Sequence, residues 1–304
     1  ETFYFSPAKA EVARQWLQEH GVVILNRVLS AAEVEVTRGL VWDWLQSLST
    51  GIDRRDPCTW TTADGRWPLD NSSTGIVCVQ GAGQSMASWS VRGSAAVQQA
   101  FATVWCTDKL ISSMDGLILW RPWQEKPASV DEPWRTRGSW LHIDQNIKKR
   151  PGLEAVQGLL SLTAADPKTT GGFVCIPGSH LPYIQQPLCE RYGDLFRRRG
   201  DFFPIPDDDP VCHLATAVSL QPGDLLLWDS RVAHGSEPAP LRVPPTELRN
   251  AEALGVEKPR MPAADLLRMA IPVCMVPRAF VAEQETFNLW RMRAVERGMT
   301  SKHW

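Results

Sequence analysis

The chain has 304 residues, enough to bury the core of one large domain or two small ones. Its hydrophobic content of 43%, charged content of 22% and formal net charge of −2 fit an ordinary globular protein and argue against a strongly basic nucleic-acid binder. No apolar run reaches membrane-spanning length, and the seven cysteines lack C-x-x-C spacing. With no signal-peptide pattern at the start, we expect an intracellular, cytoplasmic protein with reduced thiols.

The first hundred residues are predicted to be mainly helical. An amphipathic helix is expected over residues 7–20, and Val22-Val23-Ile24-Leu25 has the pattern of a buried strand. Ser30 and Glu33 form the pattern of a capping box, which predicts the start of a second helix. A third helix is expected over residues 94–105.

A long segment rich in Gly, Ser, Asp and Thr separates these helices. It runs from Thr50 to Trp89 and contains Trp60 and Trp67. Long loops in compact domains are usually lids, binding loops or disordered segments, and disordered segments are poor in aromatic residues. We therefore expect a lid that covers the open end of the domain and contacts substrate. The alternative is that these tryptophans only pack the base of the segment against the sheet.

The remainder of the chain is dominated by short predicted strands. Each strand is apolar or alternating and is bounded by Gly, Pro or Asp. The strands are expected near residues 116–120, 139–143, 155–163, 172–176, 215–220, 224–228 and 268–276, with a last helix near 283–298. This order favours an α+β fold, namely a double-stranded β-helix (the cupin-like jelly-roll) flanked by N-terminal and C-terminal helices. We expect one domain over residues 1–304 with its β-helix core at about 113–278.

A candidate metal site begins in Trp140-Leu141-His142-Ile143-Asp144-Gln145. Side chains alternate along a strand, so His142 and Asp144 are expected to point to the same side. His234 follows a later apolar strand and offers a second imidazole. Two histidines and one carboxylate on one face of an octahedron leave three positions open, which is the arrangement of non-haem Fe(II) oxygenases.

The order of motifs is more specific than H-x-D alone, which strands also contain by chance. The segment LHIDQN is followed by VQGLLSL, GGFVCIPGSH, LQPGDLLLWDSRVAHG and LLRMAIPVCMVPR, over about residues 139–278. This part of the chain resembles the phytanoyl-CoA dioxygenase-like family of Fe(II)/2-oxoglutarate oxygenases, and GVVILNRVLSAAEV resembles the opening strand and helix of that family. The resemblance implies that His142, Asp144 and His234 are the ligands of Fe(II).

The resemblance also implies a basic residue that pairs with the far carboxylate of 2-oxoglutarate. Arg268 opens the apolar strand after His234, and the planar fork of a guanidinium binds carboxylates bidentately. The segment between these two residues is longer than in compact members of the family, and Arg260 within it is the second candidate. Gln157, on the strand after H-x-D, is a further candidate contact of the co-substrate.

The expected activity follows from the same resemblance. Related halogenases leave the carboxylate position vacant, whereas Asp144 occupies it here, which favours hydroxylation or a related oxidation. We expect a dioxygenase that uses O₂ to oxidise a C–H bond of a small organic substrate and releases succinate and CO₂. Two alternatives stay open, namely the same fold acting on a nucleic-acid base or a protein side chain, and a non-enzymatic jelly-roll binding protein. Five residues are candidates for lining the substrate pocket: Trp60, Trp67, Trp89, Trp120 and Arg121.

Overall fold

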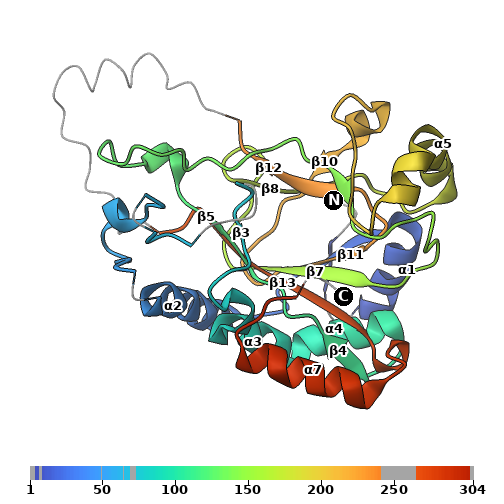
Figure 1. Cartoon of the computed structure of the whole chain (residues 1–304), viewed down its shortest axis with the longest axis horizontal. Helices are drawn as coiled ribbons and strands as arrows, with labels where there is room; N and C mark the ends of the chain where they lie inside the picture. The colour runs from blue at the N-terminus through green and yellow to red at the C-terminus, as the bar shows by residue number, and fades with distance from the viewer. Residues whose placement is uncertain are drawn as a thin grey trace.

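Two β-sheets face each other, and helices cover the outer side of the larger sheet (Figure 1). The computed structural model describes residues 4–6, 9–48, 50–63, 65–68, 73–240 and 265–301. The eight-stranded sheet contains β1 (Tyr4–Phe5), β2 (Val22–Leu25), β3 (Ile76–Val77), β4 (Leu110–Ser112), β5 (Leu117–Trp120), β7 (Val156–Ser161), β11 (Leu225–Asp229) and β13 (Arg268–Pro277). The five-stranded sheet contains β6 (His142–Ile143), β8 (Gly171–Cys175), β9 (Phe203–Pro204), β10 (Thr216–Ala217) and β12 (His234–Pro238).

Strand pairing is antiparallel throughout the described sheets except between β1 and β2. The order in the larger sheet is β1-β2-β11-β7-β13-β5-β3 with β4 paired to β13, and the order in the smaller sheet is β10-β8-β12-β6-β9. Mixed helices and antiparallel sheets confirm the predicted α+β class. The described strands form two open sheets and no closed barrel, so the double-stranded β-helix stays a prediction at this point.

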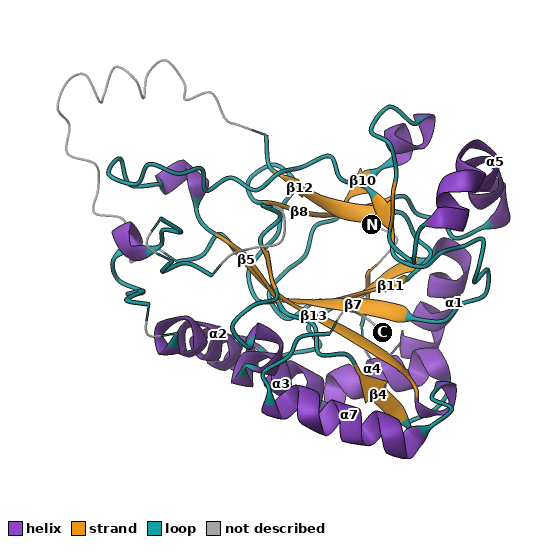
Figure 2. Cartoon of the chain, viewed as in Figure 1, coloured by secondary structure: helices purple, strands orange, loops and turns teal. Residues whose placement is uncertain are grey.

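The helices lie mostly beneath the larger sheet (Figure 2). The predicted capping box is present, because the Ser30 hydroxyl accepts from the Glu33 amide at 3.3 Å and the Glu33 carboxylate accepts from the Ser30 amide at 2.8 Å. Among the described helices, none is long and apolar enough to cross a lipid bilayer. Their bounds are α1 (Ala10–His20), α2 (Ala31–Ser47), α3 (Met86–Gly93), α4 (Ala95–Trp105), α5 (Pro182–Arg198) and α7 (Gln284–Glu296).

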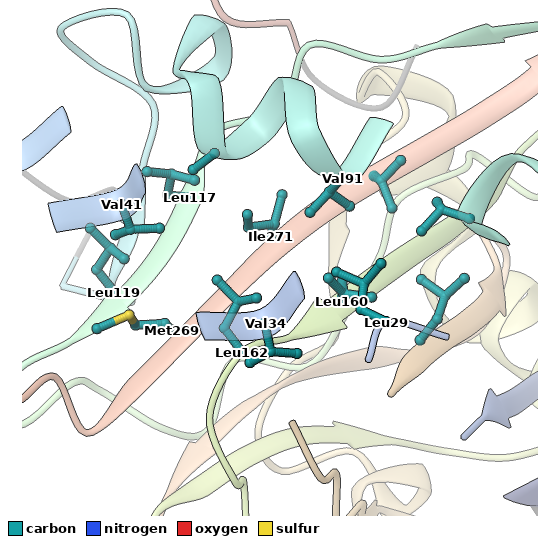
Figure 3. Close-up of a cluster of buried hydrophobic side chains, with 14 of the residues drawn as sticks. Leu29, Val34, Val41, Val91, Leu117, Leu119, Leu160, Leu162, Met269 and Ile271 are labelled. Carbon is teal, nitrogen blue, oxygen red and sulfur yellow. The ribbon is translucent and has the colours of Figure 1, made fainter. Parts of the chain in front are cut away.

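Alternation along the strands divides the interior into two apolar layers. On β11, Leu225 and Leu227 face the helices, whereas Leu226 and Trp228 face the space between the two sheets. The helix side is closely packed, since a Cβ added at Gly158 of β7 would lie 3.0 Å from the Phe101 ring of α4. Figure 3 shows part of this layer, with Leu29, Val34, Val41, Val91, Leu117, Leu119, Leu160, Leu162, Met269 and Ile271 labelled. The helix layer thus supports the larger sheet and leaves its opposite face available for polar groups.

Candidate metal centre

His142, Asp144 and His234 meet between the two sheets. His142 on β6 lies directly opposite His234 on β12, and residues directly opposite in an antiparallel pair project to the same face. Asp144 follows β6 by one residue, and alternation turns it to the side that His142 occupies. All three side chains are buried, and one ligand atom from each lies within 4.8 Å of the others. The structure therefore assembles the predicted triad of side chains.

Backbone carbonyls set the orientation of both imidazoles. His142 Nδ1 lies 3.1 Å from the Trp140 carbonyl, and His234 Nδ1 lies 2.9 Å from the Val232 carbonyl. A carbonyl only accepts hydrogen bonds, so each neutral ring carries its proton on Nδ1 and keeps a lone pair on Nε2. These Nε2 atoms lie 3.5 Å and 3.3 Å from the two carboxylate oxygens of Asp144. The lone pairs of three groups thus face one another.

The two Nε2 lone pairs and the Asp144 carboxylate suit a shared metal cation better than protonation of an imidazole. Burial lowers the pKa of His234, and the neighbouring His142 lowers it further, which outweighs the opposite effect of Asp144. The neutral imidazole is the form that ligates metals. Atoms bound at about 2.1 Å in adjacent positions of an octahedron lie about 3 Å apart, close to the observed spacings. The donor set and its spacing fit one first-row divalent metal.

Gln157 holds the carboxylate of this triad from the opposite sheet. Its Nε2 donates to Asp144 Oδ2 at 2.9 Å, and both side chains are buried. Hydrogen bonds to ligating carboxylates fix their orientation and raise metal affinity. We expected this glutamine to contact the co-substrate. The structure places its amide on Asp144, and a role toward the co-substrate stays a prediction.

Among the described residues, Arg268 is a buried cation with no counter-ion. It is 1% exposed at the start of β13, and its Cζ lies 4.5 Å from the ring centroid of Trp120 on β5. Within the described part of the chain, its Nε and Nη1 have no hydrogen-bond partner. Burial lowers its pKa to about 10, so it stays charged at neutral pH. A buried charge is costly unless it is paired, which marks this position as a site for an anion. The second candidate, Arg260, lies outside the described residues.

The predicted lining residues divide into two groups. Trp120 lies between the sheets beside Arg268, as expected for a pocket residue. Trp60 and Trp67 are instead buried in the helix-side core, and Trp89 lies on α3, which packs against α2, α4 and β13. For Trp60 and Trp67 the packing alternative describes their environment, whereas the half-buried Trp89 contacts Gln84 and Arg92. Arg121 is held by the Trp60 carbonyl at 2.8 Å and by the Glu132 carboxylate.

Aromatic rings surround the two histidines. Trp140 stacks on His142 with centroids 4.9 Å apart, and Trp228 lies 5.1 Å from His234. Sequence reasoning missed Phe173, 5.6 Å from His234, and Phe202, 4.8 Å from His142. Strand alternation within GGFVC could have pointed to the phenylalanine on β8, whereas no sequence signal marks the one in the loop before β9.

The family model of phytanoyl-CoA dioxygenase (PhyH) matches residues 17–239. This match includes the H-x-D motif and the distal histidine. The chain belongs to the phytanoyl-CoA dioxygenase family. As a member of that family it is a non-haem iron dioxygenase that depends on 2-oxoglutarate, and its cofactors are iron and 2-oxoglutarate.

The chain is also similar to individual proteins and solved structures. Ava biosynthesis cluster protein O of Aspergillus versicolor is 27% identical over 280 residues, which cover 89% of this chain and 79% of that protein. The apoform of EctD from S. alaskensis is 14% identical with a TM-score of 0.51, over 89% of this chain and 78% of that one. EvdMO1 is 15% identical with a TM-score of 0.53, over 89% of this chain and 50% of that one. At these identities, the two structures bear on the fold of this phytanoyl-CoA dioxygenase family member and not on its substrate.

Proposed function

We propose that this dioxygenase hydroxylates a C–H bond of a small organic molecule. The reaction consumes the substrate, O₂ and 2-oxoglutarate and yields the hydroxylated substrate, succinate and CO₂. The observation that carries the proposal is the convergence of the Nε2 lone pairs of His142 and His234 on the carboxylate of Asp144. Iron bound by these three residues supplies the oxidation chemistry, with open positions for the co-substrate and O₂.

The charge of the ligand set suits an anionic co-substrate. Two neutral imidazoles and one carboxylate leave one positive charge on Fe(II). Arg268 adds a second positive charge at the start of β13, where no described residue pairs with it. 2-Oxoglutarate is a dianion, so its far carboxylate would accept hydrogen bonds from the Nε and Nη1 of Arg268, which have no partner among the described residues. Trp120 stacks on that guanidinium and limits its orientations.

The surrounding residues keep the centre dry and in position. Trp140 and Trp228 pack on the two histidines, and burial of all three ligands excludes bulk water. Exclusion of water protects reactive intermediates from side reactions. Gln157 fixes the carboxylate of Asp144, which would hold this ligand in one orientation toward iron. Because Asp144 fills the carboxylate position, hydroxylation is favoured over halogenation.

We further propose that the two sheets are those of a double-stranded β-helix. Strands alternate between the sheets from β5 to β8 and again from β10 to β13, whereas β8, β9 and β10 all belong to the five-stranded sheet. A jelly-roll generates this alternation by winding a long hairpin across two sheets. The small-molecule class of substrate is supported by the near-neutral charge of the chain and by the name of the A. versicolor relative, which places that protein in a biosynthesis cluster.

The decisive experiment looks for an oxygenated product. The purified chain is incubated with Fe(II), 2-oxoglutarate, O₂ and a metabolite extract, and products are analysed by mass spectrometry under ¹⁸O₂. We expect one compound to gain one labelled oxygen atom while succinate accumulates, and neither change with a His234→Ala variant. A chlorinated product, or one that has only lost two hydrogens, would contradict hydroxylation.

A further inference from the structure

A cavity lies at the other end of β13 from Arg268. Its volume is about 460 Å³, and it is bounded by β4, by the loop at residues 150–154, by the C-terminal half of β13 and by α7. Its walls are mainly apolar, with Ile111, Val276 and Phe287 among them. Cavities of about 300–1,000 Å³ with apolar walls and a few polar groups are typical of small-molecule sites.

The cavity lies on the same face of the sheet as the candidate metal centre. Cys274, which lines the cavity, is directly opposite Gln157 in the pairing of β13 with β7. Opposite residues in an antiparallel pair share a face. Gln157 in turn donates to Asp144 at 2.9 Å. The cavity therefore begins one strand away from the residue that orients the carboxylate, and it shares none of the ligands.

The apolar lining of the cavity comes from a pair of adjacent strands and from one helix. Ile111 of β4 is directly opposite Val276 of β13, so these two side chains form one continuous apolar surface. Phe287 of α7 lines the same space. An apolar chain or ring placed here would lose contact with water on several sides, which is the main source of affinity for such ligands.

Two arginines line the cavity, and they differ in their partners. Arg150 is paired with Glu154 at 3.1 Å and with Asp201. Arg291 of α7 is half-buried, and no hydrogen bond or ion pair joins it to another residue of the described ranges; its Cζ lies 5.6 Å from the ring of Phe287. Burial lowers the pKa of Arg291, with no compensating carboxylate. Within the described ranges this guanidinium therefore has no anionic partner that a ligand would have to displace.

We propose that the cavity binds an amphipathic carboxylate, with its apolar body against Ile111, Val276 and Phe287 and its head group on Arg291. The planar guanidinium fork suits a carboxylate, which it can bind bidentately. The apolar surface beside the fork distinguishes this site from one for a small inorganic anion. The inference concerns residues that take no part in holding iron or 2-oxoglutarate, so it stands independently of the function proposed above.

Binding of decanoate and decan-1-ol to the full chain tests the proposal by isothermal titration calorimetry. We expect saturable binding of one decanoate per chain and weaker binding of the alcohol. Arg291→Gln should weaken decanoate binding about tenfold or more, because a charge-assisted contact is lost, and should leave alcohol binding unchanged. Arg293→Gln is the matched control, because this exposed arginine lies on the same helix outside the cavity lining.

A second variant tests the apolar part of the cavity without changing the charge of Arg291. Val276→Phe adds a ring inside the cavity and should weaken binding of both ligands, while the thermal unfolding midpoint reports whether the fold is retained. Equal effects of Arg291→Gln and Arg293→Gln would overturn the proposal. So would unchanged decanoate affinity in folded Val276→Phe, since binding would then occur elsewhere on the surface.

Discussion

Gln157 of β7 and Asp144, which follows β6, join the two sheets through a buried hydrogen bond of 2.9 Å. The bond links the larger sheet to the carboxylate of the candidate metal centre. Rigid support of this kind fixes ligands more precisely than loop contacts do. The position of the carboxylate therefore depends on the packing of the two sheets against each other.

The first prediction concerns this bond. Gln157→Leu retains most of the volume of the side chain but removes the donor, so Asp144 can rotate away from the histidines. We expect Fe(II) affinity to fall by about 10–100-fold, measured by anaerobic metal titration. Gln157→Glu should weaken binding as well, because it places a second carboxylate against the first. Wild-type affinity in both variants would show that the hydrogen bond does not position the ligand.

The second prediction concerns the ligands themselves. His142→Ala, Asp144→Ala and His234→Ala should each abolish stoichiometric iron binding and succinate formation while the far-UV circular dichroism spectrum is retained. His180→Ala is the control, since that buried histidine contacts the Gln18 carbonyl at 3.0 Å and lies outside the triad. It should reduce stability but keep iron. A triad variant with normal iron content would remove that residue from the ligand set.

The third prediction separates binding from stability at Arg268. Its buried charge has no counter-ion in the described structure, so Arg268→Met should stabilise the ligand-free protein by about 1–4 kcal/mol. The thermal midpoint should then rise by a few degrees. The same change should raise the concentration of 2-oxoglutarate needed for turnover by about 100-fold or more, because a bidentate contact with a carboxylate is lost.

Iron affinity supplies the control for this variant. It should be unchanged, because Arg268 is not among the metal-ligating groups. Lower stability together with normal dependence on 2-oxoglutarate would show that the guanidinium serves the fold. The co-substrate contact would then belong to another residue.

Local sequence patterns could predict the elements and the triad. Strand alternation in H-x-D places His142 and Asp144 on one side, and the capping box at Ser30 marks the start of α2. Both features depend on residues close together in the chain. The pairing of β6 with β12 then brings His234 opposite His142, which the order of motifs indicated through the family resemblance.

Contacts between distant segments could not be predicted in this way. The bond between Gln157 and Asp144 depends on how two sheets face each other, and a one-residue change of register would break it. Helix α5 was missed because Pro187 within it has the pattern of a helix break. The tryptophans of the segment at 50–68 predict that their side chains are buried, but they do not show which part of the core they pack against. Trp60 packs 5.1 Å from Trp42 of α2 rather than on the metal centre.

The last prediction concerns the contact between the segment at 50–68 and Glu132, which lies in the loop that follows β5. The Glu132 carboxylate accepts hydrogen bonds from the Thr62 amide at 2.8 Å and from the Thr62 and Thr61 hydroxyls, and it also pairs with Arg121. Burial raises the pKa of Glu132, but the hydrogen bonds from Thr62 and Arg121 outweigh burial and lower it below its usual value.

Because the folded pKa lies below the unfolded value, the carboxylate stabilises the fold above about pH 4.5, and this contribution is lost as the pH falls through the folded pKa. Glu132→Gln should therefore lower the thermal midpoint at pH 7, and the difference from wild type should shrink as the pH falls through the lowered pKa of Glu132. Hydrogen exchange should also become faster at Thr61 and Thr62 in the variant, with exchange in β7 unchanged. A difference in midpoint that is constant with pH would show that the carboxylate charge does not stabilise this contact.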